Sequence, residues 1–154
     1  MATELKMRLH AVVCAGAVLT LLIPLQSATG QSASADVGFK TPSGRIHCEA
    51  FPDDEGRTAI LRCDITGPNQ PRVRRPADCE LDYGYAFELR SAKGARASLI
   101  CAGDTVADPK HRVLAYGGSW EYLGLRCEVT PARLRCLNAS GHGFALSSRQ
   151  QRLF

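Results

Sequence analysis

One tripeptide occurs three times in the chain: Leu61-Arg62-Cys63, Leu125-Arg126-Cys127 and Leu134-Arg135-Cys136. Each copy alternates apolar and charged residues, and two copies continue the alternation into Asp64-Ile65 and Glu128-Val129. A period of two is typical of a strand with one buried and one solvated face. The tripeptide therefore predicts three strands, each with leucine and cysteine on the inner face and arginine on the outer face.

The first copy predicts a hairpin with the segment before it. We expect Cys48 to face Cys63 across an antiparallel pair. The remaining partners are then compatible on both faces: Ile46 with Ile65 and Ala50 with Leu61 inside, and Glu49 with Arg62 and His47 with Asp64 outside. Since a shift of one residue would carry charged side chains inside, this register should be strongly specified.

The second and third copies predict a hairpin with each other. Setting Cys127 opposite Cys136 places Val129 against Leu134 inside and Glu128 against Arg135 outside. Thr130 to Arg133 would form the connection, and Pro131 argues against a type I′ turn because its φ is negative.

Two more hairpins follow from turn residues. Pro42-Ser43-Gly44 separates 39–41 from 45–49, and Ser91 to Gly94 separates 83–89 from 95–101. In the second hairpin we expect three facing pairs: Phe87 with Ala97, Leu89 with Ala95 and Glu88 with Arg96. A short strand is also expected over Arg112 to Tyr116.

The part of the chain after residue 35 shows no sustained apolar period of 3.6 residues, so few or no long helices are expected. The predicted fold is all-β: a small disulfide-stabilised sandwich or open barrel built from antiparallel hairpins.

Residues 1–35 have the pattern of a signal peptide. Lys6 and Arg8 precede an apolar run, Ala11 to Leu25, that is shorter than the roughly 20 residues of a membrane span. Cleavage could follow Gly30 or Ala35, and the two sites stay open. We expect one domain over 36–154, secreted or periplasmic, with no membrane span after the leader is removed.

The cysteines beyond the leader are even in number, and an oxidising compartment would pair them. They are Cys48, Cys63, Cys79, Cys101, Cys127 and Cys136. The two hairpin registers propose 48–63 and 127–136, and elimination leaves 79–101. Neither C-x-x-C pairs nor histidines at ligand spacing occur, so no metal and no cofactor is predicted.

The formal net charge is +4, and a basic loop, Gly67 to Pro76, carries part of it. The loop lacks the interleaved aromatic residues that single-stranded nucleic acids stack on, and the other arginines fall at alternate strand positions. A nucleic-acid partner is therefore not expected, and a basic surface loop is favoured over a polyanion site.

Six short sequence words together resemble a family of small secreted bacterial proteins of unknown function. They are Thr-Pro-Ser-Gly (41–44), Cys-Asp-Ile (63–65), Cys-x-Leu-Asp-x-Gly (79–84), Cys-Ala-Gly-Asp-Thr (101–105), Leu-x-Tyr-Gly-x-Ser (114–119) and Asn-x-x-Gly-His-Gly-Phe-x-Leu-Ser (138–147). One departure is an extra serine, Ser148, before Arg149. The resemblance implies a single exported cysteine-rich domain and supplies no established activity or catalytic residues.

The candidate site residues lie in the loosely patterned segments. His142 between two glycines could act with Asp104 and Thr105, or with Ser119, as a base beside a nucleophile. A loop histidine bonded to backbone explains it equally simply, as an Asx turn explains Asp104. No nucleophile elbow or phosphate loop accompanies them, so no catalytic residue is assigned.

Two aromatic residues complete the set. Tyr116 and Trp120 flank a Gly-Gly pair and could form a platform for a sugar or peptide, although Trp120 could equally be a core anchor. The tentative binding residues are therefore Asp104, Thr105, Tyr116, Trp120 and His142. We favour a non-enzymatic binding or envelope-associated module with a protein or carbohydrate ligand. A small secreted hydrolase using His142 and an inhibitor-like partner protein remain the alternatives.

Overall fold

The structure is a computed structural model that describes residues 37–67 and 74–154. In these residues all regular structure is strand, as the absence of helical periodicity predicted. The leader predicted over 1–35 and most of the basic loop over 67–76 lie outside the described residues.

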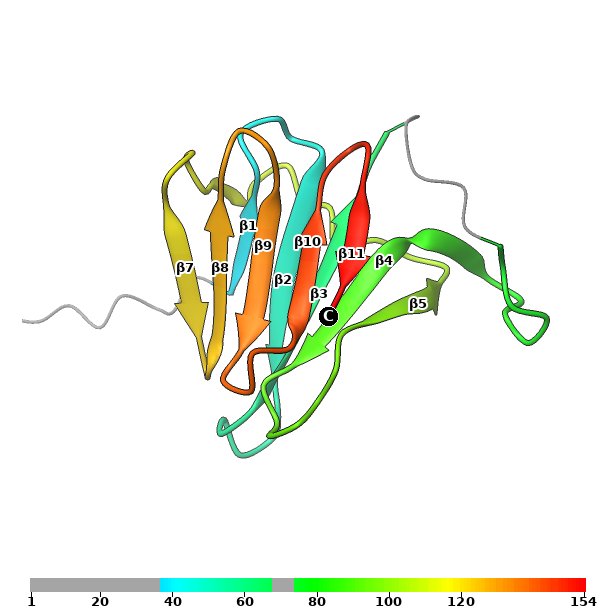
Figure 1. Cartoon of the computed structure of the whole chain (residues 1–154), viewed down its shortest axis with the longest axis horizontal. Helices are drawn as coiled ribbons and strands as arrows, with labels where there is room; N and C mark the ends of the chain where they lie inside the picture. Colours follow the sequence, from blue (N-terminus) through cyan, green and yellow to red (C-terminus); the bar gives the residue numbers. More distant parts are fainter. Residues whose placement is uncertain (1–36, 68–73) are drawn as a thin grey trace, which may run out of the picture. The chain divides into compact units, whose positions relative to one another are not determined.

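The strands form two sheets (Figure 1). The first sheet has the order β5-β4-β3-β2-β1-β6, with bounds β1 Gly38–Lys40, β2 Ile46–Pro52, β3 Ala59–Ile65, β4 Asp82–Arg90, β5 Ser98–Ala102 and β6 Arg112–Val113. The second has the order β11-β10-β9-β8-β7, with bounds β7 Ser119–Tyr122, β8 Leu125–Val129, β9 Leu134–Asn138, β10 Gly143–Leu146 and β11 Gln151–Leu153. Every pairing is antiparallel except β1 with β6, which is parallel.

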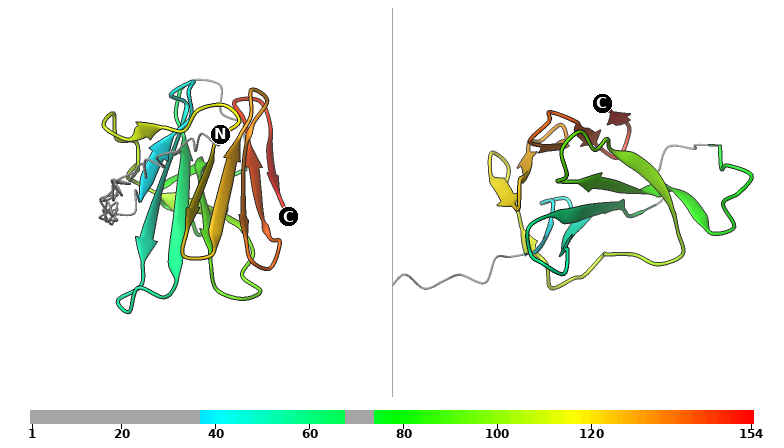
Figure 2. Two further views of the ribbon diagram at one scale, coloured as in Figure 1. Left: turned by 90° about the vertical axis from the view of Figure 1, so that its left-hand side faces the viewer. Right: turned by 90° about the horizontal axis from the view of Figure 1, so that it is seen from below.

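The two sheets pack face to face around one apolar core (Figure 2). Aromatic pairs join them: the ring centroids of Phe39 and Trp120 are 5.2 Å apart, and those of Phe87 and Phe144 are 6.1 Å apart. Neither sheet closes on itself. The fold is therefore a sandwich rather than a barrel, which confirms the predicted all-β class.

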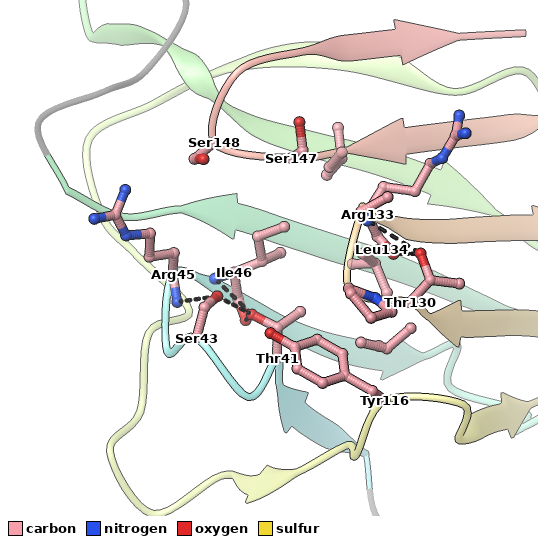
Figure 3. Close-up of a pocket in the computed structure, with 14 residues that line it drawn as sticks. Thr41, Ser43, Arg45, Ile46, Tyr116, Thr130, Arg133, Leu134, Ser147 and Ser148 are labelled. Atoms are coloured by element: carbon pink, nitrogen blue, oxygen red, sulfur yellow. Dashed lines mark hydrogen bonds between the residues drawn. The ribbon is translucent and has the colours of Figure 1, made fainter.

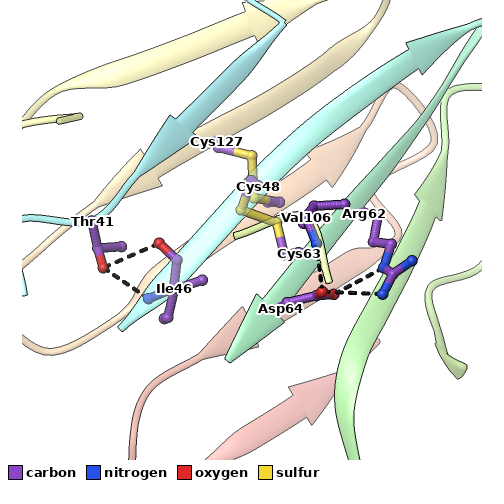
Figure 4. Close-up of a disulfide and its surroundings, with 9 residues drawn as sticks. Thr41, Ile46, Cys48, Arg62, Cys63, Asp64, Val106 and Cys127 are labelled. Atoms are coloured by element: carbon purple, nitrogen blue, oxygen red, sulfur yellow. Dashed lines mark hydrogen bonds and ion pairs between the residues drawn. A yellow bond between two sulfur atoms is a disulfide. The ribbon is translucent and has the colours of Figure 1, made fainter. Parts of the chain in front are cut away.

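Three disulfides form in the pairing that the sequence proposed: Cys48–Cys63 and Cys127–Cys136 between strands, and Cys79–Cys101 between the loop before β4 and β5. The first and third link directly facing residues whose Cα atoms are 4.1 Å apart, close to the spacing of a non-hydrogen-bonded pair. Their sulfur atoms lie in the core, and Figure 4 draws Cys127 among the surroundings of Cys48–Cys63. These bonds thus replace part of the apolar packing of a small domain.

Both registers built on the repeated tripeptide are confirmed. Strand β2 pairs with β3 through every predicted partner, from Ile46 with Ile65 to Ala50 with Leu61, and β8 pairs with β9 as predicted. The hairpin through Pro42-Ser43-Gly44 is also present, and Gly44 there has a positive φ of 67°. The period-two pattern was sufficient for these hairpins because one face of each strand is buried.

The predicted register of the β4–β5 hairpin is wrong over most of its length. Phe87 faces Leu99 and Glu88 faces Ser98, which is two residues away from the expected partners. The register shifts between Tyr83 and Ala86, where Gly84 has a φ of 107°. A bulge therefore takes up two residues, and β5 begins at Ser98 rather than Ala95.

Two further expectations need correction. The strand expected over Arg112 to Tyr116 is only the two residues of β6. The pair His47 and Asp64 faces across β2 and β3 as predicted, yet it is not solvated: His47 is 8% exposed and Asp64 is 0% exposed. Something must therefore cover the outer face of the first sheet at this pair.

Candidate binding site at one end of the sandwich

The cover over the outer face of the first sheet is the segment that follows β5. The buried carboxylate of Asp64 accepts hydrogen bonds from Arg62 Nε at 2.9 Å, from Arg62 Nη2 at 3.1 Å and from the backbone N–H of Val106 at 2.9 Å (Figure 4). Arg62 also donates to Asp104, through Nη1 to Oδ1 at 2.7 Å and through Nη2 to the carbonyl at 2.5 Å. We call Arg62, Asp64, Asp104 and Val106 the outer clip.

Tyr85 adds to the outer clip from β4. Its hydroxyl lies 2.9 Å from the carbonyl oxygen of Ala102 and 2.7 Å from that of Asp104. Burial, with help from the nearby Asp64 charge, raises the pKa of Tyr85, so the phenol stays protonated and able to donate. These hydrogen bonds tie Ala102, Asp104 and Val106 to β3 and β4, so the clip holds the segment on the sheet.

Charge pairing in the clip shifts two pKa values. The hydrogen bond from Arg62 lowers the pKa of the Asp104 carboxyl. Burial works against the charge of Arg62, but the hydrogen bonds to Asp64 and Asp104 outweigh it and raise the pKa of the guanidinium. Both groups therefore stay ionised near neutral pH.

The same segment reaches the edge of the sheet at His111. A Cβ atom added to Gly38 would collide with the imidazole of His111, so that ring packs directly on the glycine backbone. The rings of His111 and His47 are 6.3 Å apart, and His111 Nε2 lies 4.0 Å from Glu49 Oε2. These contacts complete the cover that buries His47.

A second polar region, at one end of the sandwich, is open. The β1–β2, β8–β9 and β10–β11 turns lie together at the top of Figure 1 and enclose a hollow of about 200 Å³ (Figure 3). We call it the mouth. Core side chains form its floor: Ile46, Val129, Leu134 and Leu146. Its rim is formed by Thr41, Ser43, Arg45, Tyr116, Thr130, Pro131, Ala132, Arg133, Ser147 and Ser148.

The mouth is electropositive. No aspartate or glutamate is among its lining residues. Arg45 and Arg133 are exposed, and the structure shows no ion pair for either guanidinium within residues 37–67 and 74–154. A second hollow of about 250 Å³ shares Arg133 and Ser147 with the mouth and adds Arg152. Anionic groups are therefore favoured across both hollows.

The rim hydroxyls are held in place by the turns that carry them. Thr41 Oγ1 lies 3.1 Å from Ser43 Oγ and 3.3 Å from the backbone N of Ile46, which donates to it. Ser147 Oγ accepts from the N–H of Gln150 at 3.0 Å, and Thr130 Oγ1 accepts from that of Arg133 at 3.2 Å. Each of the three also donates its proton to a backbone carbonyl, Thr41 to Ile46, Thr130 to Arg133 and Ser147 to Gln150, so what they can offer a ligand is an acceptor lone pair.

The tentative binding residues do not lie together. Tyr116 is 51% exposed and lines the mouth. Trp120 is 3% exposed and lies in the core between the rings of Phe39 and Tyr122. Asp104 belongs to the outer clip, and the exposed Thr105 accepts from the N–H of Ala107.

The Asx turn expected at Asp104 is replaced by a different arrangement. Its carboxylate accepts from Arg62, and the N–H of Val106, two residues further on, donates to Asp64 instead. The local pattern could not show this because Asp64 lies far away in the sequence.

His142 lies at the opposite end of β9 from the mouth. The tight β9–β10 turn is closed by Asn138, whose backbone N–H donates to the His142 carbonyl and whose Oδ1 accepts from the His142 N–H. Gly141 has a φ of 78°, and a Cβ on Gly143 would collide with the carbonyl of Cys136. Both glycines therefore have structural reasons, and neither points to an accessible catalytic imidazole.

Sequence reasoning missed most of the mouth. Thr41, Ser43, Arg45, Arg133 and Ser147 lie in turns, where hydroxyl and charged residues are common for local reasons. A signal would have required knowing that the three turns lie at one end of the sandwich, which depends on the order of strands in both sheets.

The chain matches a known protein family but no individual protein. No curated protein and no solved structure matches the chain. The residues that the structure describes contain no helix long and apolar enough to cross a membrane, and no group of three or more His, Cys, Asp or Glu side chains that could hold a metal ion. A family does match, over residues 17–154, which is nearly the whole chain. The chain belongs to this family, which is described as a family of unknown function (DUF6636).

Proposed function

We propose that the protein is an exported, disulfide-stapled binding domain without enzymatic activity, and that the mouth is its ligand site. Export is supported by the signal-peptide pattern of residues 1–35. The three disulfides support it as well, because such bonds persist in oxidising compartments.

One observation carries the assignment of the site. The mouth presents Arg45 and Arg133, which are exposed and have no acidic partner in the described part of the chain. Arg62 of the outer clip, by contrast, donates its hydrogen bonds to Asp64 and Asp104. Polar groups that the fold has not satisfied keep their hydrogen-bonding capacity for a ligand. The concave shape and the turn residues around it fit that role.

A hydrolase built on His142 has less support. In residues 37–67 and 74–154 the structure shows no hydrogen bond between the His142 imidazole and a serine, threonine or carboxylate, and the flanking glycines are explained by backbone geometry. Asp104 and Thr105 lie on the outer face of the first sheet rather than beside the β9–β10 turn. An inhibitor-like role would require a partner protein, which stable co-purification would reveal.

Amide chemical shifts test the site. We would record ¹⁵N–¹H spectra of the exported protein with galacturonate, N-acetylglucosamine, glycerol phosphate and trialanine. The expected result is that at least one probe moves the amides of 41, 43–45, 130, 132–133 and 147–150 and leaves those of 102–106 unchanged. If none of the four probes moves the mouth amides, the proposed site is wrong.

A companion variant separates binding from hydrolysis. His142→Ala should leave the chemical-shift response of the mouth unchanged, because the β9–β10 turn lies at the other end of β9. If the wild-type protein hydrolyses p-nitrophenyl acetate and His142→Ala abolishes that activity, the hydrolase alternative replaces the binding proposal.

A further inference from the structure

We propose that the mouth binds an acidic saccharide, with the carboxylate of a uronic-acid unit held by Arg45 or Arg133. This inference rests on the proposed function and names its ligand class. Four features of the mouth carry it: its charge, its hydroxyl groups, its aromatic ring and its continuity with the neighbouring hollow.

The positive charge of the mouth favours an anionic ligand. Arg45 and Arg133 flank the mouth, Arg152 lines the adjoining hollow, and neither hollow has an acidic lining residue. A guanidinium can bind both oxygens of a carboxylate with two parallel hydrogen bonds. Because these arginines are exposed and lack acidic partners in the described residues, the anion would not have to displace an internal ion pair.

The hydroxyl groups favour a ligand that donates hydrogen bonds. Ser43, Thr130, Ser147 and Ser148 place four hydroxyls around the rim, while Thr41, which also lines the mouth, is only 5% exposed. Because Thr130 and Ser147 donate their protons to backbone carbonyls, they can only accept from a ligand, which suits the donating hydroxyls of a sugar better than the oxygens of phosphate, which mainly accept. The turns fix the side chains of Thr130 and Ser147 before any ligand arrives, which lowers the entropic cost of binding.

Apolar contacts with a ligand would come from the rim of the mouth rather than from its floor. The floor residues Ile46, Val129, Leu134 and Leu146 are between 0% and 4% exposed, so they offer a peptide or lipid almost no apolar anchor. Tyr116 is 51% exposed and Pro131 lies on the same rim. A flat ring that is half exposed can stack on the C–H face of a sugar, whereas a protein partner would be expected to use a deep apolar pocket.

The dimensions suit one unit of a chain. About 200 Å³ is below the roughly 300–1,000 Å³ of sites for drug-sized ligands, so the mouth holds one sugar unit rather than a whole oligosaccharide. The second hollow shares Ala132, Arg133 and Ser147 with it. An oligosaccharide can therefore run from one hollow to the next, with Arg133 placed to meet carboxylates on neighbouring units.

Calorimetric titration with tetragalacturonate tests the ligand class. Its methyl ester has the same sugar chain without the charges and serves as the matched ligand control. We expect the acid to bind at least tenfold more tightly than the ester and to bind more weakly as salt is raised, since exposed charges are screened. Equal affinity for acid and ester would overturn the proposal, because the carboxylate would then not be recognised.

Variants locate the binding. Arg133→Gln and Tyr116→Ala should each weaken tetragalacturonate binding about tenfold, the effect of losing one charge-assisted contact or one stacked ring. Arg96→Gln removes the same charge from an exposed residue of the β4–β5 connection, at the other end of the strands, and should leave affinity unchanged. If Arg96→Gln weakens binding as much as Arg133→Gln, the attraction is non-specific and the proposal fails.

Other ligand classes give distinct results. Hexa-aspartate binding as tightly as tetragalacturonate would indicate an acidic protein partner and overturn the saccharide class, while sulfate competing equally would indicate a simple anion site. In either case the mouth amides still move, so the proposed function stands and only the ligand class fails. Failure of every one of these ligands to move those amides would remove both.

Discussion

Arginine has opposite uses in the outer clip and in the mouth. Arg62 in the clip has a side chain that is 11% exposed, and it bonds both oxygens of the buried Asp64 as well as two groups of Asp104. Arg133 in the mouth is exposed, and among the described residues its hydrogen bonds are made by its backbone, in the β8–β9 turn. Hydrogen-bond saturation, rather than residue type, therefore separates a structural cluster from a binding surface.

The same substitution at both arginines gives the largest expected effect. Arg62→Gln should lower the free energy of unfolding by about 3–5 kcal/mol, because it leaves the buried Asp64 carboxylate without its charged partner. Arg133→Gln should change it by less than about 0.5 kcal/mol, as is usual for an exposed side chain. Urea unfolding followed by circular dichroism measures both values.

Equal destabilisation by the two variants would contradict the division between clip and mouth. If Arg62→Gln does not fold, Arg62→Lys serves as the second variant, because lysine keeps the charge but not the paired hydrogen bonds. The urea midpoint of Arg62→Lys should be lower than that of the wild type and higher than that of Arg62→Gln.

The disulfide beside the clip should have the next largest effect. Replacing Cys48 and Cys63 together by alanine removes a bond that closes 15 residues and lies in the core. For a loop of this length the expected loss is about 3 kcal/mol. Differential scanning calorimetry should show a lower melting temperature, while tetragalacturonate binding at a temperature where the variant is folded should be unchanged.

The melting temperature of the variant without Cys48 and Cys63 decides whether this disulfide stabilises the core. If the variant without Cys48 and Cys63 melts at the wild-type temperature, the bond does not stabilise the core. If it melts lower and also loses ligand affinity, the mouth depends on the clip side of the sandwich and the two regions are not independent.

Tyr85 makes a smaller contribution to the clip. Tyr85→Phe removes the hydroxyl that lies near the carbonyl oxygens of Ala102 and Asp104 and keeps the ring. The loss of one net hydrogen bond should cost about 1 kcal/mol. Hydrogen exchange would show faster exchange of the Val106 amide in this variant, while unchanged exchange there would mean that Arg62 and Asp64 hold the segment alone.

Much of the fold was predictable because the two sheets share one buried core. Alternation along β2, β3, β8 and β9 specified which side chains face inward, and the cysteines then specified the register. The same reasoning failed for β4 and β5, because a bulge at Gly84 has no signature in the alternation of the flanking residues. Local pattern thus predicted regular pairing and missed its interruption.

The site was less predictable because it depends on contacts between distant segments. The alternation placed His47 and Asp64 on the outer face correctly, but could not show that the segment after β5 covers them. Tyr116 was identified for its aromatic ring and does line the mouth, whereas Trp120 was used by the core. The mouth arginines carried no signal of their own, since exposed arginines in turns are common.

Asp104 should give the smallest effect, and its sign depends on pH. The hydrogen bond from Arg62 lowers the pKa of the folded Asp104 carboxyl below its ordinary value of 3.8. A lowered pKa stabilises the folded state above the unfolded pKa, and this contribution is lost as the pH falls through the folded pKa. Wild type should therefore melt above Asp104→Asn at about pH 6, and the difference should vanish well below pH 4. Asp54→Asn, at an exposed residue of the β2–β3 turn, is the matched control for the loss of one surface carboxylate. If the difference in melting temperature instead grew on acidification, the charge of Asp104 would destabilise the folded state. That result would contradict a stabilising role for the 2.7 Å ion pair between Asp104 and Arg62.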